Sequence, residues 1–227
     1  MLNLLQISLT TMCNFSCWHC PVTKWRNVKP EFPMSNSELI PFLEKYVDPQ
    51  EWVVELTGGE PSLYEGIEEL MEWLSAKGYY TLVKTNGSGN LPKLPNVKIV
   101  SAFHRLEEPP KNYDEYLIID KVQREEKESY CKERGIPYKV VGYNFENPDG
   151  ATHGFATFAF VNPDGRNPGC QGCRIEAEIV GDCDVNRITE RSFSSRTCCQ
   201  SCKAAIDAWR FLPEDIKKRR FKQRMRG

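Results

Sequence analysis

The sequence predicts an α/β fold in two domains. These are a trimmed, partial (β/α)6 TIM barrel over residues 1–148 and a small cysteine-rich metal-binding extension over residues 149–227. The first observation is an alternation of strand-like and helix-like segments, which is typical of parallel strands joined by helical crossovers. The second is that two connections look too short for a helix. The third is that turn sequences and cysteines replace the alternation after residue 145.

Six short apolar segments are predicted as strands and three longer segments as helices. Ser35 and Glu38 form a capping-box pattern that begins the first helix. The second helix follows from apolar residues at 67, 70, 71 and 74, which have the spacing i, i+3, i+4, i+7. Residues 122–134 suit a third, polar helix. The predicted strands are residues 3–9, 52–56, 79–83, 97–103, 116–119 and 138–141.

The short connections limit the size of the barrel. Residues 87–96 contain several glycines and prolines, and residues 104–113 contain Pro109-Pro110. Both residue types disfavour helix interiors. A full eight-fold barrel of about 250 residues therefore does not fit, whereas a partial barrel of about six strands does. In the extension we expect a β-hairpin around Gly181-Asp182, followed by a helix.

Composition narrows the class of protein. About 40% of the chain is hydrophobic and 27% is charged, as in a globular protein. No apolar run approaches the length of a membrane span, and the first residues do not resemble a secretory signal. We therefore expect a cytoplasmic protein without a membrane partner. The chain has ten cysteines, and all but Cys131 fall into two clusters. In a reducing compartment, clustered cysteines more often bind metal than form disulfides.

The first cysteine cluster lies in a loop just after the first predicted strand. Cys13, Cys17 and Cys20 form a C-x3-C-x2-C run. Three thiolates this close together can bind one soft metal centre. If no fourth cysteine joins them, an iron–sulfur cluster would keep one iron open for chemistry. The alternatives are a zinc site completed by His19 and an ordinary ferredoxin-type cluster.

A second motif follows the second predicted strand. It is Gly58-Gly59-Glu60-Pro61. Paired glycines let the backbone approach a ligand closely, and a glutamate carboxylate can accept hydrogen bonds from an ammonium group. The motif is weak when taken alone, because strand-to-helix turns often have similar sequences.

Together the two motifs resemble the radical S-adenosylmethionine (radical SAM) superfamily, over roughly residues 3–145. The resemblance implies a 4Fe–4S cluster on Cys13, Cys17 and Cys20, with the methionyl group of S-adenosylmethionine on the fourth iron. It also implies that Gly58, Gly59 and Glu60 hold the methionyl amine and that Pro61 belongs to the same cofactor-binding loop. Reductive cleavage would give a 5′-deoxyadenosyl radical that abstracts a hydrogen atom from the substrate.

The resemblance extends to other positions. It implies cofactor contacts for His19 and for Thr85 and Asn86, which close the third strand. The fourth strand can be aligned in two ways. One alignment puts Ser101 at the cofactor, and the other puts Ala102 there and makes His104 face the substrate.

The last third of the chain holds a second cysteine cluster. Two C-x2-C pairs bracket the predicted hairpin, which is a strong metal-binding pattern. The segment resembles the SPASM or twitch extensions of radical SAM enzymes, which implies an auxiliary 4Fe–4S cluster. Structural zinc is the alternative. The expected ligands are Cys170, Cys173, Cys199 and Cys202, and Cys183 or Cys198 could replace one of them.

The sequence leaves the substrate class open. Peptide or protein modification is slightly favoured, with nucleotide or nucleic-acid modification next because residues 217–226 carry seven basic side chains. Flavodoxin or ferredoxin is the expected electron donor. Two alternatives are a non-catalytic iron–sulfur or zinc module that binds nucleic acid, and an electron-transfer ferredoxin.

Overall fold

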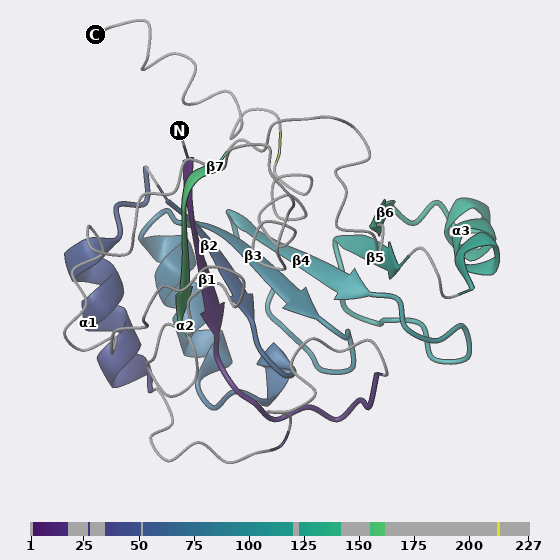
Figure 1. Ribbon diagram of the computed structural model, residues 1–227, viewed down its shortest axis with the longest axis horizontal. Coiled ribbons are helices and arrows are strands. Elements are labelled where there is room, and N and C mark those ends of the chain that lie inside the picture. Colours follow the sequence, from purple (N-terminus) through teal and green to yellow (C-terminus); the bar gives the residue numbers. More distant parts are fainter. Residues whose placement is uncertain are drawn as a thin grey trace, which may run out of the picture.

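A single parallel sheet forms the centre of the computed structural model (Figure 1), which describes residues 2–17, 27, 35–50, 52–119, 123–141, 155–161 and 213. Its seven strands are hydrogen-bonded in the order β6-β5-β4-β3-β2-β1-β7. The six predicted strands are all present, with ends shifted by one or two residues, and the partial-barrel fold is confirmed. The strands are β1 (Leu2–Ser8), β2 (Trp52–Thr57), β3 (Tyr80–Thr85), β4 (Val97–Ala102), β5 (Glu115–Ile119), β6 (Tyr138–Val141) and β7 (Phe155–Val161).

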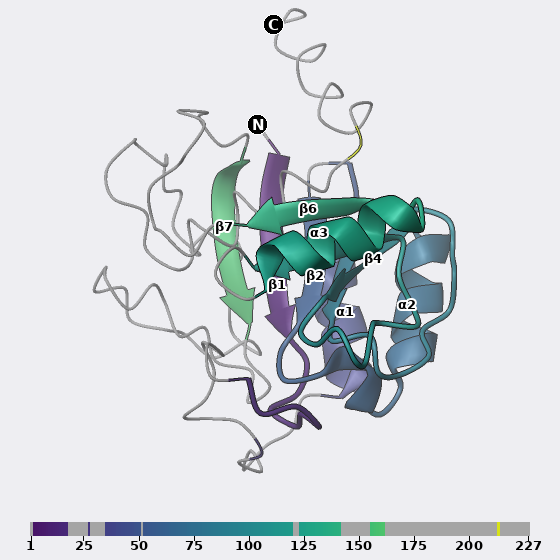
Figure 2. The same ribbon diagram turned by 90° about the vertical axis from the view of Figure 1, so that its right-hand side faces the viewer.

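In the described residues, three α-helices connect the strands, as the sequence predicted. Helix α1 (Asn36–Tyr46) lies between β1 and β2, α2 (Ile67–Ala76) between β2 and β3, and α3 (Arg124–Glu133) between β5 and β6. The β3–β4 and β4–β5 connections, which are fully described, contain no helix. Figure 1 shows α1 and α3 at opposite ends of the sheet, and in Figure 2, turned so that the α3 side faces the viewer, α3 lies in front.

Strand β7 extends the sheet on the outer side of β1. It pairs with β1 in parallel, and Leu5 lies opposite Ala159. Residues 155–161 had been placed in the cysteine-rich extension. The structure puts this segment in the barrel sheet, beyond the boundary expected at residue 148.

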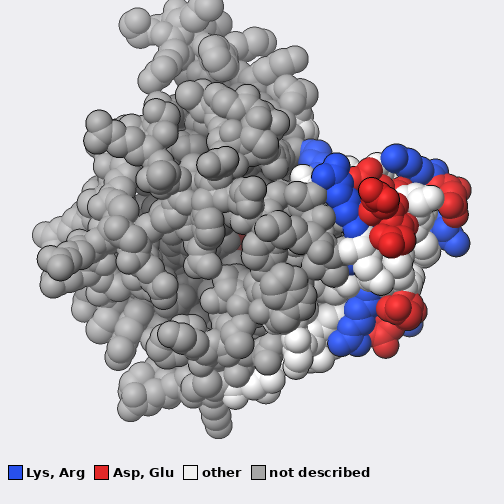
Figure 3. Space-filling model, turned by 45° about the vertical axis from the view of Figure 1, so that its right-hand side comes forward, with Lys and Arg blue, Asp and Glu red and all other residues white. Residues whose placement is uncertain are grey.

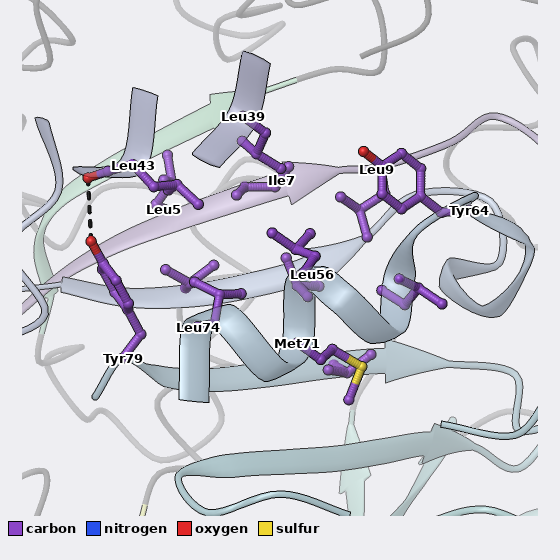
Figure 4. Packing of buried hydrophobic residues seen from close by; sticks show 14 of the residues in the cluster. Leu5, Ile7, Leu9, Leu39, Leu43, Leu56, Tyr64, Met71, Leu74 and Tyr79 are labelled. Atoms are coloured by element: carbon purple, nitrogen blue, oxygen red, sulfur yellow. Dashed lines mark hydrogen bonds between the residues drawn. The ribbon is translucent and has the colours of Figure 1, made fainter. Parts of the chain in front are cut away.

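Apolar side chains at alternate positions of the strands form the main core, which lies between the sheet and its first two helices. Leu5 and Ile7 of β1 and Leu56 of β2 are completely buried there. Figure 4 shows them facing apolar residues of α1 and α2, including Leu39 and Leu74. The sheet therefore has one helix-covered apolar face, as expected for βα units.

The opposite face of the same strands is polar. Glu55 of β2 has no exposed surface, accepts a hydrogen bond from the Gln6 amide, and lies 3.0 Å from the Lys84 ammonium nitrogen. Farther along the sheet, Glu115 pairs with Lys98 at 2.5 Å. Because alternate residues of a strand point to opposite faces, these ion pairs line the inner side of the partial barrel.

Candidate functional site

Four loops carry the described site residues, and each follows the carboxyl end of a strand. They are the cysteine loop (residues 10–17), the glycine loop (58–60), the asparagine turn (86–88) and the histidine loop (103–105). Because β1 to β4 are parallel neighbours, their carboxyl ends lie at one edge of the sheet. This is the edge at which α/β proteins bind ligands.

Backbone hydrogen bonds join the cysteine loop to the glycine loop. The amide of Gly59 donates to the Thr10 carbonyl at 2.6 Å, and the amide of Glu60 donates to the Met12 carbonyl at 2.7 Å. A Cβ atom on Gly58 would lie 2.5 Å from the Thr10 oxygen, and one on Gly59 would lie 2.1 Å from the Met12 oxygen. Gly58 also has φ = +133°, which side chains rarely adopt. The absence of side chains at Gly58 and Gly59 thus leaves room for the backbone of the cysteine loop, as well as for a ligand.

The Glu60 carboxylate links the glycine loop to the end of β3. It has no exposed surface. It accepts hydrogen bonds from the Thr85 hydroxyl at 2.5 Å, the Asn86 amide at 2.7 Å and the Ser62 amide at 3.0 Å. Three donors compensate for burying a charged group. Glu60 and Thr85 are therefore positioning residues in this structure, and the expected contact of Glu60 with an ammonium group stays a prediction.

Asn86 connects the asparagine turn to the cysteine loop. Its side-chain amide donates to Asn14 Oδ1 at 2.8 Å and lies 4.0 Å from Cys13 Sγ. The Asn14 amide in turn donates to the Ser88 hydroxyl at 2.9 Å. The structure thus places Asn86, one of the residues predicted from the sequence, next to Cys13.

Asn27 supports the cysteine loop from a later part of the chain. Its side-chain Oδ1 accepts a hydrogen bond from the backbone amide of Cys13 at 2.8 Å, and its backbone amide donates to the Thr11 carbonyl at 2.9 Å. Sequence reasoning missed this residue, because a single asparagine outside any motif gives no signal. Its φ of +58° is one that asparagine tolerates better than most residues.

The ring of His104 lies beside Cys17, the second cysteine of the loop. Its Nδ1 lies 3.5 Å and its Nε2 3.9 Å from Cys17 Sγ. The ring also makes an edge contact with Phe15, with centroids 5.7 Å apart. The Phe15 amide lies 3.4 Å from Cys13 Sγ, so this residue contributes to both cysteine environments.

Ser101 lies on the other face of β4. It is completely buried and its hydroxyl donates to the Asn112 carbonyl. It shares its face with Ile99 and Phe103, both members of the helix-side cores. The structure therefore does not bring Ser101 to the cysteines, whereas it does bring His104 to them.

Several predicted ligands fall outside the described residues. They are His19 and Cys20 of the first cluster and all the cysteines of the second cluster, namely Cys170, Cys173, Cys183, Cys198, Cys199 and Cys202. Within the described part of the chain, no group of three metal-binding side chains is gathered. The roles of these residues stay predictions.

A comparison with protein families decides the family. The family model of the radical SAM superfamily matches residues 7–149, more than half of the chain. The chain belongs to the radical SAM superfamily. This membership implies a 4Fe–4S cluster and S-adenosylmethionine, and it supports an enzyme.

Two curated relatives of this radical SAM protein are named for purine-type compounds, one for the deazaguanine that it makes and the other for GTP. A 7-carboxy-7-deazaguanine synthase of Halobacterium salinarum is 37% identical over 81 residues, which are 35% of this chain and 30% of that protein. The mitochondrial GTP 3′,8-cyclase of Arabidopsis thaliana is 36% identical over 97 residues, 41% of this chain and 25% of that protein. The chain thus spans less than a third of the length of these two relatives.

Solved structures with bound S-adenosylmethionine share the fold. SuiB of Streptococcus suis, bound to S-adenosylmethionine, superposes with a TM-score of 0.58 at 11% identity and covers 89% of this chain and 71% of its own. A structure described as anSMEcpe with bound AdoMet gives a TM-score of 0.55 at 14% identity over 96% of this chain and 85% of its own. At these identities, the likeness concerns the fold alone.

The described residues fit the cluster that radical SAM membership implies. Cys13 and Cys17 are partly exposed at the ligand-binding edge, and neither forms a disulfide. Nitrogen atoms lie close to each sulfur: the Phe15 amide at Cys13 and the His104 ring at Cys17. Soft thiolates suit iron, and polar groups around a metal site orient its ligands.

Proposed function

We propose that the chain is a radical SAM enzyme whose cluster is held by Cys13, Cys17 and Cys20. When bound, the cluster supplies the electron that cleaves S-adenosylmethionine and so generates a 5′-deoxyadenosyl radical. The observation that carries the proposal is the convergence of the cysteine loop, the glycine loop and the asparagine turn at one edge of the sheet. Family membership supports the same reaction class.

The role of the polypeptide in this reaction is to hold the loops of the site in place. Backbone hydrogen bonds hold the cysteine loop against Gly59 and Glu60, and Glu60 fixes the Asn86 backbone. We propose that the glycine loop through Pro61 and the side chain of Asn86 line the S-adenosylmethionine site, together with His19. Thr85 and Ser101, which are buried behind it, would support the site without touching the cofactor.

Sequence relatives favour a nucleotide-type substrate. The GTP 3′,8-cyclase acts, by name, on a purine nucleotide, and the 7-carboxy-7-deazaguanine synthase is named for a purine-type product. A peptide substrate, slightly preferred from the sequence, has a structural counterpart in SuiB bound to its precursor peptide. We propose a nucleotide-type small molecule first and a peptide second. Turnover assays with both classes would separate them.

The cysteine-rich extension is proposed to hold an auxiliary 4Fe–4S cluster on Cys170, Cys173, Cys199 and Cys202. The proposal rests on their spacing and on the twitch-like composition of the segment. Metal analysis after anaerobic reconstitution tests it. About eight iron atoms per chain would support two clusters, whereas about four iron atoms and one zinc would support structural zinc.

The competing hypothesis is a non-catalytic nucleic-acid-binding module. On the face drawn in Figure 3, the described surface near α3 carries acidic and basic side chains side by side. Arg124 and Lys132 of this helix both pair with Glu128. The phosphate backbone of a nucleic acid attracts surfaces that are uniformly positive. This part of the surface is of mixed charge. The basic residues 217–226 lie outside the described residues.

One assay separates these functions. The chain is reconstituted anaerobically, reduced and given S-adenosylmethionine, and 5′-deoxyadenosine is measured. We expect product from the wild type and none from Cys17→Ala. Cys131→Ala is the matched control, because Cys131 is a buried residue of α3 in an apolar cluster, and this variant should retain cleavage. A fully loaded wild type that gives no product would contradict the proposal.

In the described residues, no helix is long and apolar enough to cross a membrane. A cytoplasmic location and a flavodoxin or ferredoxin donor stay parts of the proposal.

A further inference from the structure

The inner face of the partial barrel carries ion-paired residues that the cofactor site does not use. They are Glu55, Lys84, Lys98, Glu115 and Lys139, on strands β2 to β6. The strand register puts Glu55 and Lys98 in one row across the sheet and Lys84 and Glu115 in the next. Barrel interiors are usually filled with apolar side chains. Charged residues at these positions therefore indicate a site for a polar ligand.

The lysines of this group are more accessible than the glutamates. The side chain of Glu55 has no exposed surface and that of Glu115 is 9% exposed, whereas Lys84, Lys98 and Lys139 are 20%, 23% and 34% exposed. In this group three ammonium nitrogens thus accompany two carboxylates, and the carboxylates are the less accessible charges. A ligand that enters the barrel would meet a positive lining.

Lys84 is the member of this group that directly precedes a part of the cofactor site. It stands two residues before Asn86, whose side-chain amide lies 4.0 Å from Cys13 Sγ. Because a strand rises about 3.3 Å per residue, the α-carbons of Lys84 and Asn86 are about 7 Å apart. An anionic group held by Lys84 would therefore bring the rest of a small molecule close to the cysteine loop.

The Lys84 ammonium has one partner among the described residues, and this is Glu55 Oε2 at 3.0 Å. That oxygen accepts no hydrogen bond, so the two groups are paired by charge without a directed N–H···O contact. The other Glu55 oxygen accepts a hydrogen bond from the Gln6 amide. An ammonium group has three N–H donors. Lys84 can therefore donate to an acceptor inside the barrel while Gln6 and Glu55 hold its counter-charge in place.

We propose that Lys84 binds an anionic group of the substrate, a phosphate or a carboxylate, and that Glu55 positions Lys84 for this contact. The inference rests on the proposed function in taking the inner side of the barrel as the substrate site. It adds the charge of the substrate to that function: an anionic small molecule. Lys98 and Lys139 add to the attraction at longer range, because charges of one sign lining a cleft concentrate ligands of the opposite sign.

The test is an equilibrium binding measurement on the full chain after anaerobic reconstitution, without a reductant. GTP is compared with uncharged guanosine for the phosphate, and 7-carboxy-7-deazaguanine with uncharged 7-deazaguanine for the carboxylate. We expect the anionic member of one pair to bind more tightly than its uncharged counterpart. Lys84→Met should weaken binding of that anion roughly 10- to 100-fold, as expected for a lost hydrogen bond to a charged group, and leave the uncharged counterpart unchanged.

Glu55→Gln distinguishes anion binding from a structural role of the pair. It removes the counter-charge of Lys84 and should therefore tighten binding of the anion, by about tenfold. An ion pair with a structural role alone would make both variants bind every probe more weakly. Lys84→Arg should keep most of the binding. Lys77→Met is the matched control, because it removes the same charge from an exposed pair between α1 and the end of α2.

Three results would overturn the inference. The first is a wild type that binds neither anionic probe more tightly than its uncharged counterpart. The second is unchanged anion binding in Lys84→Met. The third, which also decides the question if Lys84→Met does not fold, is a Glu55→Gln variant that binds the anion no more tightly than the wild type. Charge-dependent binding without any 5′-deoxyadenosine from the reduced wild type would instead contradict the proposed function and leave the anion site standing.

Discussion

The two halves of the barrel hold their site residues by different means. In the β1–β3 half, backbone hydrogen bonds join the cysteine loop to the glycine loop, and the side chains of Glu60 and Asn86 add to them. In the β4–β6 half, side chains hold the loops: Lys127 fixes the histidine loop, and the Tyr116 hydroxyl donates to the Pro110 carbonyl at 2.6 Å. A site built from backbone contacts requires particular small residues, whereas one built from side chains tolerates conservative replacement. Substitutions that add a single methyl group should therefore reduce activity much more in the first half than in the second.

The largest effect is expected at Gly59. In Gly59→Ala the added methyl group would meet the Met12 carbonyl oxygen at 2.1 Å, so the two loops must separate. A displacement of about 1 Å in an active site can reduce the rate roughly 100-fold. The measurement is 5′-deoxyadenosine formation per cluster. Gly78→Ala is the control for this variant, because a Cβ added at Gly78 has no atom within 4 Å, although the positive φ of Gly78, which Gly59 does not share, strains the substituted backbone.

Glu60→Gln should have the next largest effect. The amide group cannot accept hydrogen bonds at both of the positions where the carboxylate now does. A buried N–H left without an acceptor destabilises a protein by about 1–3 kcal/mol. Urea unfolding would measure this loss. Glu65→Gln, at an exposed position on the same connection, should leave the midpoint unchanged, and an equal loss in both variants would contradict the argument.

A smaller effect is expected in the other half from Tyr116→Phe. The variant keeps the buried ring but leaves the Pro110 carbonyl without this donor. The expected loss of unfolding free energy is about 1 kcal/mol, with cleavage activity retained. Tyr138→Phe is the comparison, since its hydroxyl contacts Glu128 at 3.3 Å in a less buried setting. If Tyr116→Phe abolished cleavage, the proposed contrast between the halves would fail.

The smallest effect is expected for the surface ion pair between Lys77 and Glu44. Its atoms are 2.7 Å apart, but each side chain is about half exposed. Such pairs contribute about 0–1 kcal/mol and less at high salt. Denaturant unfolding of Lys77→Met at low and high salt would check this, and a large salt-independent loss would contradict it.

The sequence predicted most of the fold because the fold follows from local patterns. Alternating apolar residues located β1 to β6, and Ser35 with Glu38 located the start of α1, where both halves of the capping box are present. Strand β7 was not predicted, because its partner is the distant strand β1 and pairing between remote segments leaves no local pattern. Its seven-residue apolar run between two turn sequences was the available signal.

The candidate site was predicted only in part, for the same reason. Contiguous motifs pointed to Cys13, Cys17 and the glycine loop. The contacts of Glu60 with β3 and of His104 with Cys17 depend on how strands are arranged, which the motifs do not encode. Asn27 illustrates the limit, since it supports Cys13 from fourteen residues away without belonging to any pattern.

The hydrogen bonds between the cysteine loop and the glycine loop also bear on how the enzyme is assembled. They join peptide groups of the chain itself, so they do not require iron–sulfur bonds to form. In small zinc domains, by contrast, metal binding supplies the free energy of folding. We therefore expect the metal-free chain to be folded before it accepts a cluster, which circular dichroism of that form would check.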